Sequence, residues 1–506
     1  MSSLRAPSGS LLITSEAPLG LDQLEQAALP LDVRIDPSVR KEVVTCHEFV
    51  LSCISDGRPV YGTTTGFGPL VGFPGRDETT AQCDNALAHL TAGQGPDLDA
   101  GVVRATMLVR LRSLCRGHSG VSSAVVESLA AALRTAFAPA VPRLGSLGAS
   151  GDLIPLAYIA RALQGEGHAY ADGERLPAAV ALRRAGLRPV RLDGRDGLAL
   201  VNGTSLTAAA GGLAAASLAR SRDCAVALSA LLADVLGCTP AFLAPELLEA
   251  FGHPDAVRAG ADLRARLDGL SPSGVRALQE PYSIRCTPQL IGAAGSALDY
   301  ADSVVRADLN GVSDNPLFFP AQDLVAHGGN FFGQPVAFAS DLLTLAATQL
   351  GNLAERQLDL LLDPHRNGGL PPMLSPDPGR QHGLQGVQLA ATAMVATMRR
   401  GATPASVQSL PTNLHNQDVI PFGTQAALNA LDTARLLRLL HGSLAVALRQ
   451  AVHVGGRRPT ASACAGLLDR LADLIPPVDH DRPLDDEVRQ AADLLDRVAD
   501  GTSRAS

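Results

Sequence analysis

Apolar residues recur at helical spacing over most of this 506-residue chain. Side chains three and four positions apart share one face of a helix, so this pattern predicts amphipathic helices. Alanine, leucine and arginine dominate these stretches, and several stretches are much longer than the average globular helix. The predicted helices cover residues 100–137, 204–236, 334–363, 383–400, 423–453 and 484–499.

Strand patterns are few and short, at residues 11–14 and 198–201. Glycine and proline cluster between the long apolar stretches, and both residue types end regular structure. The pattern therefore predicts a mainly α fold, a bundle of long helices that meet in an oligomer. Irregular segments inside a compact protein carry polar backbone groups that are costly to bury, so a functional role is the expected explanation. We therefore expect the catalytic and binding residues in the loops. The glycine and proline clusters predict loops at residues 57–75, 139–155, 165–189, 311–333 and 370–379.

The composition narrows the functional classes. Hydrophobic residues make up 46% of the chain and charged residues 18%, with a net charge of −8. There is no basic excess to neutralise phosphates, which argues against a nucleic-acid partner. The sequence has no uninterrupted run of about 20 apolar residues, and its first ten residues carry no apolar stretch of the signal-peptide type. We expect a cytoplasmic protein that acts on a small molecule and does not bind a membrane.

Lysine is nearly absent, which excludes two classes of enzyme. Lys41 is the single lysine, in a polar stretch without a glycine-rich phosphate loop. Pyridoxal phosphate (PLP) enzymes need a lysine for the Schiff base, and P-loop proteins need Gly-Lys-Ser or Gly-Lys-Thr. The eight cysteines show no CxxC spacing, and the twelve histidines show no HxxxH or HExxH spacing. We therefore expect buried reduced thiols, no metal and no PLP.

The segment at residues 145–155, GSLGASGDLIP, allows two interpretations. In the first, Ser150 or Asp152 caps a helix that has Pro155 in its first turn. In the second, the glycine nitrogen of the Ala-Ser-Gly tripeptide attacks the alanine carbonyl and two waters leave, one of them from the Ser150 side chain. The product is a methylidene-imidazolone, a strong electrophile. Glycine offers an unhindered nitrogen and unusual backbone angles for this cyclisation.

The same segment resembles the signature of the aromatic amino acid ammonia-lyases and aminomutases, the family of histidine, phenylalanine and tyrosine ammonia-lyases. Six further segments resemble motifs of this family and follow in its order. They are YGTTTGFG from Tyr61, LVNGT from Leu200, QEPYSIR from Gln279, SDNP from Ser313, HGGNF from His327 and NQD from Asn416.

The resemblance implies a mainly α fold, a long-helix bundle of the fumarase/aspartase-like superfamily with a loop-rich N-terminal part. It implies a domain at residues 1–205 with the Tyr61 loop and the prosthetic group, and a helix-bundle domain at residues 206–506 that forms the oligomer core. The implied cofactor is 4-methylidene-imidazol-5-one (MIO), formed autocatalytically from Ala149, Ser150 and Gly151. The resemblance also implies a homotetramer whose active sites draw loops from three subunits.

Elimination of ammonium also requires removal of a weakly acidic β-proton. By resemblance Tyr61 is the base, although a tyrosine with an ordinary pKa of about 10 needs nearby donors for this role. Tyr282 would assist near the amine. Arg285 would bind the α-carboxylate through its planar guanidinium, and Asn202 and Gln279 would support that network. Structural tyrosines and a surface ion pair of Arg285 are the alternatives.

Other positions are implied by the resemblance to contact the substrate. Asn330 and Phe331 would place an amide and an aromatic face beside the site, the alternative being a turn followed by a core phenylalanine. The remaining implied contacts are Leu153, Asn413, Asn416 and Gln417.

The pair His89-Leu90 bears on which amino acid is bound. The resemblance implies that the two corresponding positions hold Ser-His in histidine lyases, Phe-Leu in phenylalanine lyases and His-Leu in bacterial tyrosine lyases. An imidazole can hydrogen-bond a phenol while leucine packs against the ring, although His89 could also be a core histidine. Gln417 stands where histidine lyases carry a glutamate, so an acidic partner for a cationic imidazole is missing.

These observations predict an ammonia-lyase that converts L-tyrosine to p-coumarate. A tyrosine 2,3-aminomutase and a phenylalanine ammonia-lyase are the alternatives, and a histidine ammonia-lyase is favoured less. A non-catalytic scaffold of the superfamily would be expected to lack Ser150, Tyr61 or Arg285, and all three are present.

Overall fold

The computed structural model describes residues 9–76, 78–455 and 457–503. It separates into two compact units. Unit 1 comprises the chain up to Leu213, Ala301–Asp341 and Pro404–Leu428, and unit 2 comprises Ala214–Tyr300, Leu342–Thr403 and the chain from Asn429. The division into two continuous domains at residue 205 stays a prediction. In the units described here, two later segments belong to unit 1, because the loops that they carry pack onto it.

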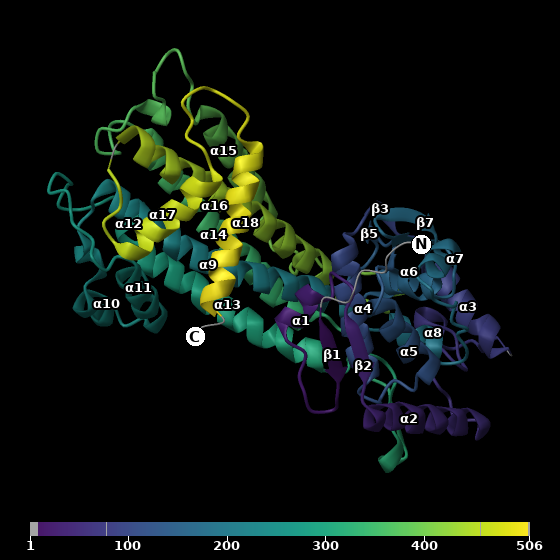
Figure 1. Cartoon of the computed structure of the whole chain (residues 1–506). Helices are drawn as coiled ribbons and strands as arrows, with labels where there is room; N and C mark the ends of the chain where they lie inside the picture. The colour runs from purple at the N-terminus through teal and green to yellow at the C-terminus, as the bar shows by residue number, and fades with distance from the viewer. Residues whose placement is uncertain (1–8, 77, 456, 504–506) are drawn as a thin grey trace. The chain divides into compact units, whose positions relative to one another are not determined.

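Unit 1 contains short helices and small sheets (Figure 1). Strands β1 and β2 are parallel, whereas β3–β5, β4–β6–β7 and β8–β9 are antiparallel. The strands are β1 Ser10–Ile13, β2 Asp32–Ile35, β3 Gln94–Asp97, β4 Ala138–Pro139, β5 Pro142–Leu144, β6 His168–Ala171, β7 Glu174–Pro177, β8 Leu317–Phe319 and β9 Leu324–Ala326. The helices are α1 Leu21–Gln26, α2 Pro37–Ser55, α3 Thr79–Leu90, α4 Ala100–Leu114, α5 Ser123–Leu133, α6 Leu153–Leu163, α7 Ala178–Arg184 and α8 Asp196–Val201.

Long helices supply most of the remaining chain. A unit boundary falls inside each of α9 Ser205–Leu236, α13 Thr287–Asn310, α14 Gln334–Leu362 and α16 Gly423–Gly455. The helices wholly in unit 2 are α10 Pro245–Phe251, α11 Pro254–Arg266, α12 Tyr282–Arg285, α15 Gln385–Gly401, α17 Ser462–Leu474 and α18 Asp485–Ser503. Short 3₁₀ turns are η1 Gly68–Leu70, η2 Pro240–Leu243, η3 Pro320–Gln322, η4 Pro372–Leu374 and η5 Asn413–His415.

The predicted helices and strands agree with this structure except in two places, but α13 was not predicted. The loop predicted at 165–189 contains β6, β7 and α7, and the loop predicted at 311–333 contains β8 and β9. Five of the six predicted helices correspond to α9, α14, α15, α16 and α18, and the strand at residues 11–14 corresponds to β1. The sixth stretch, 100–137, divides into α4 and α5 around Gly117 and Gly120, both at positive φ. The strand predicted at 198–201 is wrong, because these residues lie in α8. Every residue of α8 is buried, and a short apolar run buried on all sides does not distinguish a strand from a helix.

Helix α4 is buried on all sides and carries arginines into the core. The guanidinium of Arg104 donates hydrogen bonds to five backbone carbonyls and, among the residues that the structure describes, to no carboxylate. These carbonyls lie at or just after the ends of α1 and α5, where a cation complements the helix dipole. Burial lowers the pKa of Arg104 to about 10. The five carbonyls belong to Ala27, Leu29, Leu133, Thr135 and Phe137.

Among the described residues, one stretch, Asp196–Leu236, is long and apolar enough to cross a membrane by length and composition. It comprises α8 and α9, and 94% of its most apolar window is buried inside the protein. Such burial is that of a core helix, so this stretch provides no support for a membrane-spanning segment.

The cysteines are free thiols, as expected from their spacing. Seven are buried and Cys286 is half-buried. Burial raises the pKa of the Cys46, Cys83 and Cys115 thiols to about 12, so these groups stay protonated and unreactive. Within the described ranges, no group of three or more histidine, cysteine, aspartate or glutamate side chains could hold a metal ion.

Candidate active site

A cavity of about 960 Å³ opens in unit 1 and brings together most of the residues predicted for the site. Its walls are the loop from Tyr61 to Arg76, one side of α3, the start of α6 and the end of α8. Its volume lies at the upper end of the range for small-molecule sites. The predicted residues that line it are Tyr61, His89, Leu90, Ser150, Leu153, Asn202, Phe331, Asn413, Asn416 and Gln417.

The Ala-Ser-Gly tripeptide forms a tight turn held by backbone hydrogen bonds. Gly151 N–H donates to the Phe331 carbonyl at 2.8 Å, and Asp152 N–H donates to the Gly203 carbonyl at 2.7 Å. Gly151 has φ +72°, and a Cβ there would lie 2.4 Å from the Gly203 nitrogen. Only glycine fits this position. Ala149 is buried, whereas Ser150 is half-buried and lines the cavity.

Asp152 occupies the N-cap position of α6, as the capping interpretation expected, but its side chain does not cap that helix. The buried carboxylate accepts hydrogen bonds from Thr207 N–H at 2.8 Å and from the hydroxyls of Thr207, Thr424 and Ser146 at 2.9, 2.7 and 2.7 Å. Thr207 lies in the first turn of α9, so Asp152 caps α9 instead. The residue next to the tripeptide therefore ties the turn to two long helices, α9 and α16.

Gln417 contacts Ser150 directly. Its Nε2 donates to the Ser150 hydroxyl at 2.5 Å, and its Oε1 accepts from the Thr412 hydroxyl at 2.6 Å. The loop between Thr412 and Gln417 is strained, because residues 413, 414 and 415 all have positive φ, between 51° and 63°. Such strain costs energy at each non-glycine residue and is often found at functional sites.

Tyr61 lines the cavity at the start of its loop. Its phenol oxygen accepts a hydrogen bond from Gly68 N–H at 2.7 Å. Its ring meets the Phe67 ring edge to face, with centroids 6.2 Å apart. The Tyr61 oxygen thus has a fixed backbone donor, while its own proton remains available to another partner.

His89 is exposed at the end of α3 and lines the cavity, so it is not a core histidine. Its Nδ1 lies 3.1 Å from the Asn85 carbonyl. Since a carbonyl only accepts, Nδ1 carries the proton of the neutral ring and Nε2 is an acceptor. Leu90 lines the cavity beside it, and the Phe67 ring lies 6.1 Å from the imidazole.

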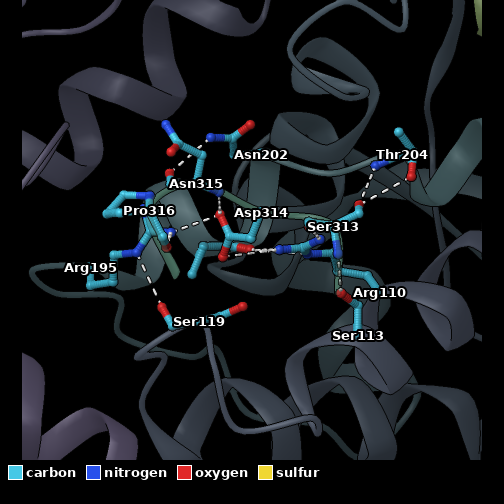
Figure 2. A network of polar contacts seen from close by, with 11 residues as sticks. Arg110, Ser113, Ser119, Arg195, Asn202, Thr204, Ser313, Asp314, Asn315 and Pro316 are labelled. Carbon is cyan, nitrogen blue, oxygen red and sulfur yellow. Dashed lines mark hydrogen bonds and ion pairs between the residues drawn. The ribbon is translucent and has the colours of Figure 1, made fainter. Parts of the chain in front are cut away.

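Asn202 follows α8 and is 3% exposed. Its Nδ2 donates to the Asn315 carbonyl at 3.0 Å, while its buried Oδ1 has no partner among the described residues (Figure 2). Asn315 also lines the cavity, and its Oδ1 accepts from Gly328 N–H at 2.8 Å. An unpaired buried acceptor is costly, so the Asn202 oxygen indicates a place for a ligand donor.

Three predicted residues lie elsewhere. Gln279, Tyr282 and Arg285 line a separate cavity of about 570 Å³ in unit 2, and none of them lines the cavity around Ser150. Arg285 comes one turn after Tyr282, as expected, and its guanidinium carbon lies 4.7 Å above the Tyr282 ring. Its Nε has no partner within the part of the chain described here, and Tyr282 is 70% exposed. Asn330 is exposed and is not among the lining residues of either cavity.

Sequence reasoning missed several residues of the site. Phe67, Gln82 and Asn85 line the cavity around Ser150. Asn315 lines it too, but it belongs to the SDNP motif, for which the sequence predicted no role. Two buried arginines, Arg110 and Arg195, lie on either side of Asp314, the residue before Asn315 (Figure 2). Arginine is so frequent in this chain that neither position stands out in the sequence. The only signal in the sequence was that apolar residues lie near each arginine, Arg110 within α4 and Arg195 directly before α8.

A family model described as aromatic amino acid lyase matches residues 19–473. The chain is 39% identical over 474 residues to a histidine ammonia-lyase of Symbiobacterium thermophilum, covering 92% of each chain. It is 42% identical over 469 residues to a tyrosine ammonia-lyase of Cereibacter sphaeroides, covering 87% of this chain and 89% of the relative. The crystal structure of tyrosine aminomutase from Streptomyces globisporus matches with a TM-score of 0.89 at 32% identity, covering 96% and 97% of the two chains.

Proposed function

The chain belongs to the aromatic amino acid lyase family, and on this premise we propose that it eliminates ammonium from L-tyrosine to give p-coumarate. Membership confirms the resemblance seen in the motifs and the mainly α, fumarase/aspartase-like fold. Its named relatives include ammonia-lyases, so the chain is a carbon–nitrogen lyase. The substrate and the cofactor are parts of the proposal.

The residues around Ser150 fit an MIO group made from Ala149, Ser150 and Gly151. Gly151 is packed against Gly203 with no room for a side chain, and Ser150 alone of the three lines the cavity. When formed, the group supplies an electrophilic carbon for the substrate amine. The backbone of Phe331 and Gly203 holds the turn, and the side chains of Asn202 and Gln417 flank it within the cavity.

Tyr61 is the proposed base for the β-proton. The residue lines the cavity, and its oxygen already accepts a hydrogen bond from Gly68 N–H, which supports the negative charge that develops as the tyrosinate forms. The Asn202 oxygen can accept from the substrate ammonium, because its amide nitrogen is committed to Asn315.

The orientation of His89 is the single observation that carries the choice of tyrosine. The bond from Nδ1 to the Asn85 carbonyl leaves Nε2 as the acceptor on the other edge of the ring. A phenol hydroxyl can donate to this nitrogen, whereas phenylalanine leaves it unpaired. Leu90 and Phe67 provide apolar surface for an aromatic ring.

A histidine ammonia-lyase is the second candidate, because a relative with this activity is 39% identical. Two features argue against it. Gln417 places an amide rather than a carboxylate against Ser150. Among the described residues no aspartate or glutamate lines the cavity, whereas Arg76 does. A cationic imidazole would therefore find no opposite charge. An aminomutase stays open, since a solved tyrosine aminomutase is 32% identical.

We also propose that the enzyme is a cytoplasmic homotetramer and that Gln279, Tyr282 and Arg285 complete the site of another subunit. The loop before Tyr282 supports an oligomer, because apolar side chains of this loop are exposed to solvent in the single chain. Val275 is 80% exposed and Leu278 is 96% exposed. Exposed apolar groups of this kind mark protein contacts.

The test is incubation of the wild-type enzyme with L-tyrosine, L-phenylalanine and L-histidine. Chromatography should separate p-coumarate, cinnamate, urocanate and β-amino acids. We expect p-coumarate to dominate and the intact mass to be two waters below that of the sequence. Urocanate as the main product would replace the substrate assignment. An unmodified mass without ammonium release from any of the three would overturn the function.

A further inference from the structure

Asp314 lies between two guanidinium groups in the interior of unit 1 (Figure 2). Arg195 donates to Asp314 Oδ1 at 2.7 Å, and Arg110 approaches Oδ2 at 3.6 Å from the opposite side. All three side chains are at most 1% exposed. Burial raises the pKa of Asp314 and lowers that of Arg110 to about 10, and the opposite charges counter both effects. Because desolvating three charges is costly, such a cluster is poorly explained by stability alone.

The cluster holds the backbone on both sides of Asn315. Asn315 N–H donates to Asp314 Oδ1 at 2.7 Å. Arg195 donates to the Pro316 carbonyl at 3.2 Å and to the Ser119 carbonyl at 3.1 Å. The backbone is therefore held at the Asn315 nitrogen by the Asp314 carboxylate and at the Pro316 carbonyl by the Arg195 guanidinium (Figure 2).

The Asn315 carbonyl in turn sets the Asn202 side chain. It accepts from Asn202 Nδ2 at 3.0 Å. Since this carbonyl cannot donate, the amide of Asn202 must turn its nitrogen to Asn315, and Oδ1 is the end without a partner. Both asparagines line the cavity, so a shift of the Asn315 peptide would reach the cavity as a rotation of the Asn202 amide.

Arg110 fixes the backbone around Asn202 from the other side. It donates to the Ala199 carbonyl in α8 and to the Ser313 carbonyl at 2.7 Å. Gly203 packs so closely on this arginine that a Cβ there would lie 2.1 Å from its guanidinium nitrogen. Asn202 is thus held between two segments that the same ion cluster anchors.

We propose that Arg195, Asp314 and Arg110 are positioning residues for Asn202, and that they keep its oxygen turned to the cavity as an acceptor for the substrate ammonium. The inference rests on the proposed function and adds three residues that touch neither the substrate nor the tripeptide. Its consequence is kinetic. Misplacing a contact group by a fraction of an ångström slows the reaction more than it weakens ground-state binding.

The experiment compares Arg195→Lys with Arg104→Lys, in the wild-type and the Asn202→Ala backgrounds. Lysine keeps the charge but loses the fork that spans Asp314, Pro316 and Ser119. Arg104 is the matched control, because it is also a buried arginine of unit 1, and its five hydrogen bonds within the described part of the chain go to backbone carbonyls outside the cluster. Melting temperature, intact mass, kcat and KM are measured for every variant, with whichever aromatic amino acid the wild type deaminates best.

We expect Arg195→Lys to lower kcat about tenfold with a change in KM below about twofold, while the loss of two waters in the mass persists. The effect on kcat should disappear when Asn202 is alanine, since the cluster then has nothing to position. Arg104→Lys should lower the melting temperature and leave kcat within about twofold of the wild type.

An unchanged kcat in Arg195→Lys overturns the proposal, and so does an equal loss in both backgrounds. Should Arg195→Lys not fold, Asp314→Asn, which keeps both arginines and the side-chain shape, is judged by the same criteria. If neither folds while Arg104→Lys does, the cluster serves stability alone and the proposal fails. The mass and products of the wild type decide the proposed function separately from all of these variants.

Discussion

Gln417 donates its side-chain amide to the hydroxyl of Ser150, a residue 267 positions earlier in the chain, across 2.5 Å. The orientation of this amide is not free, because the Thr412 hydroxyl donates to its oxygen. A hydrogen-bond donor is therefore held against the hydroxyl oxygen that leaves in the proposed cyclisation of the tripeptide. The contact joins the late motif of the sequence to the Ala-Ser-Gly motif within a single unit.

Ser150→Ala should abolish activity and leave the fold intact, since only Ser150 can provide the methylidene carbon. Intact mass should show the wild type lighter than its sequence by two waters and the variant without this loss. The melting temperature should change little, because the side chain is small and half-buried. A variant that kept turnover, or a wild type of unmodified mass, would contradict the assignment of the prosthetic group.

Tyr61→Phe should lower kcat and kcat/KM together by about 10²–10⁴-fold, the range typical of general acid–base catalysis. Exchange of the substrate β-hydrogen with deuterated water should vanish, while the loss of two waters from the tripeptide persists. Tyr158→Phe is the matched control, because Tyr158 lies in α6 and does not line the cavity, and its hydroxyl bonds the Gly93 carbonyl at 3.5 Å. Near-normal turnover in Tyr61→Phe would require another base.

His89→Phe should shift the preference from tyrosine to phenylalanine. Loss of the bond from the phenol to Nε2 is worth about 1–3 kcal/mol, which corresponds to roughly 5- to 150-fold in specificity. The wild type should also reject O-methyl-L-tyrosine, which has an acceptor at the para position but no donor. Kinetics with the three amino acids would check both points, and an unchanged tyrosine-to-phenylalanine ratio would exclude His89 as the selectivity residue.

Asp308→Asn should stabilise the protein above pH 6. Burial raises the pKa of Asp308 from its ordinary 3.8 to about 6, against the opposing effect of the bond from the Thr204 hydroxyl. Between these values the folded state keeps a proton that the unfolded state has lost, so the free energy of unfolding falls as pH rises through this window. Above about pH 6 the folded protein carries the full free-energy cost of the desolvated Asp308 carboxylate, and an uncharged asparagine removes this cost.

Melting temperatures at pH 5 and pH 7.5 test this prediction. The gain of Asp308→Asn over the wild type should be larger at pH 7.5. Asp302→Asn, on the same helix but in an exposed ion pair with Arg306, should show no such increase. An equal difference at both pH values would mean that Asp308 does not titrate in this window.

The sequence alone predicted most of the long helices, though not α13, and it predicted ten residues that line one cavity. The spacing of apolar positions placed α9, α14, α15, α16 and α18, because a helix buries one face and this requirement is local. The Ala-Ser-Gly motif and its companions pointed to Ser150, Tyr61, His89 and Asn202, which line one cavity, because each proposed role requires a particular side chain wherever the chain folds.

The tertiary structure decided which of these groups meet. Asp152 stands at the start of α6 but caps α9, and Gln279, Tyr282 and Arg285 line a cavity of unit 2 rather than the one around Ser150.

The burial of Arg110 and Arg195 around Asp314 was equally invisible in the sequence, where one arginine resembles any other. The reason is physical. A periodic pattern reports which face of an element is buried, whereas the partner of a polar group is set by the packing of segments far apart in the chain.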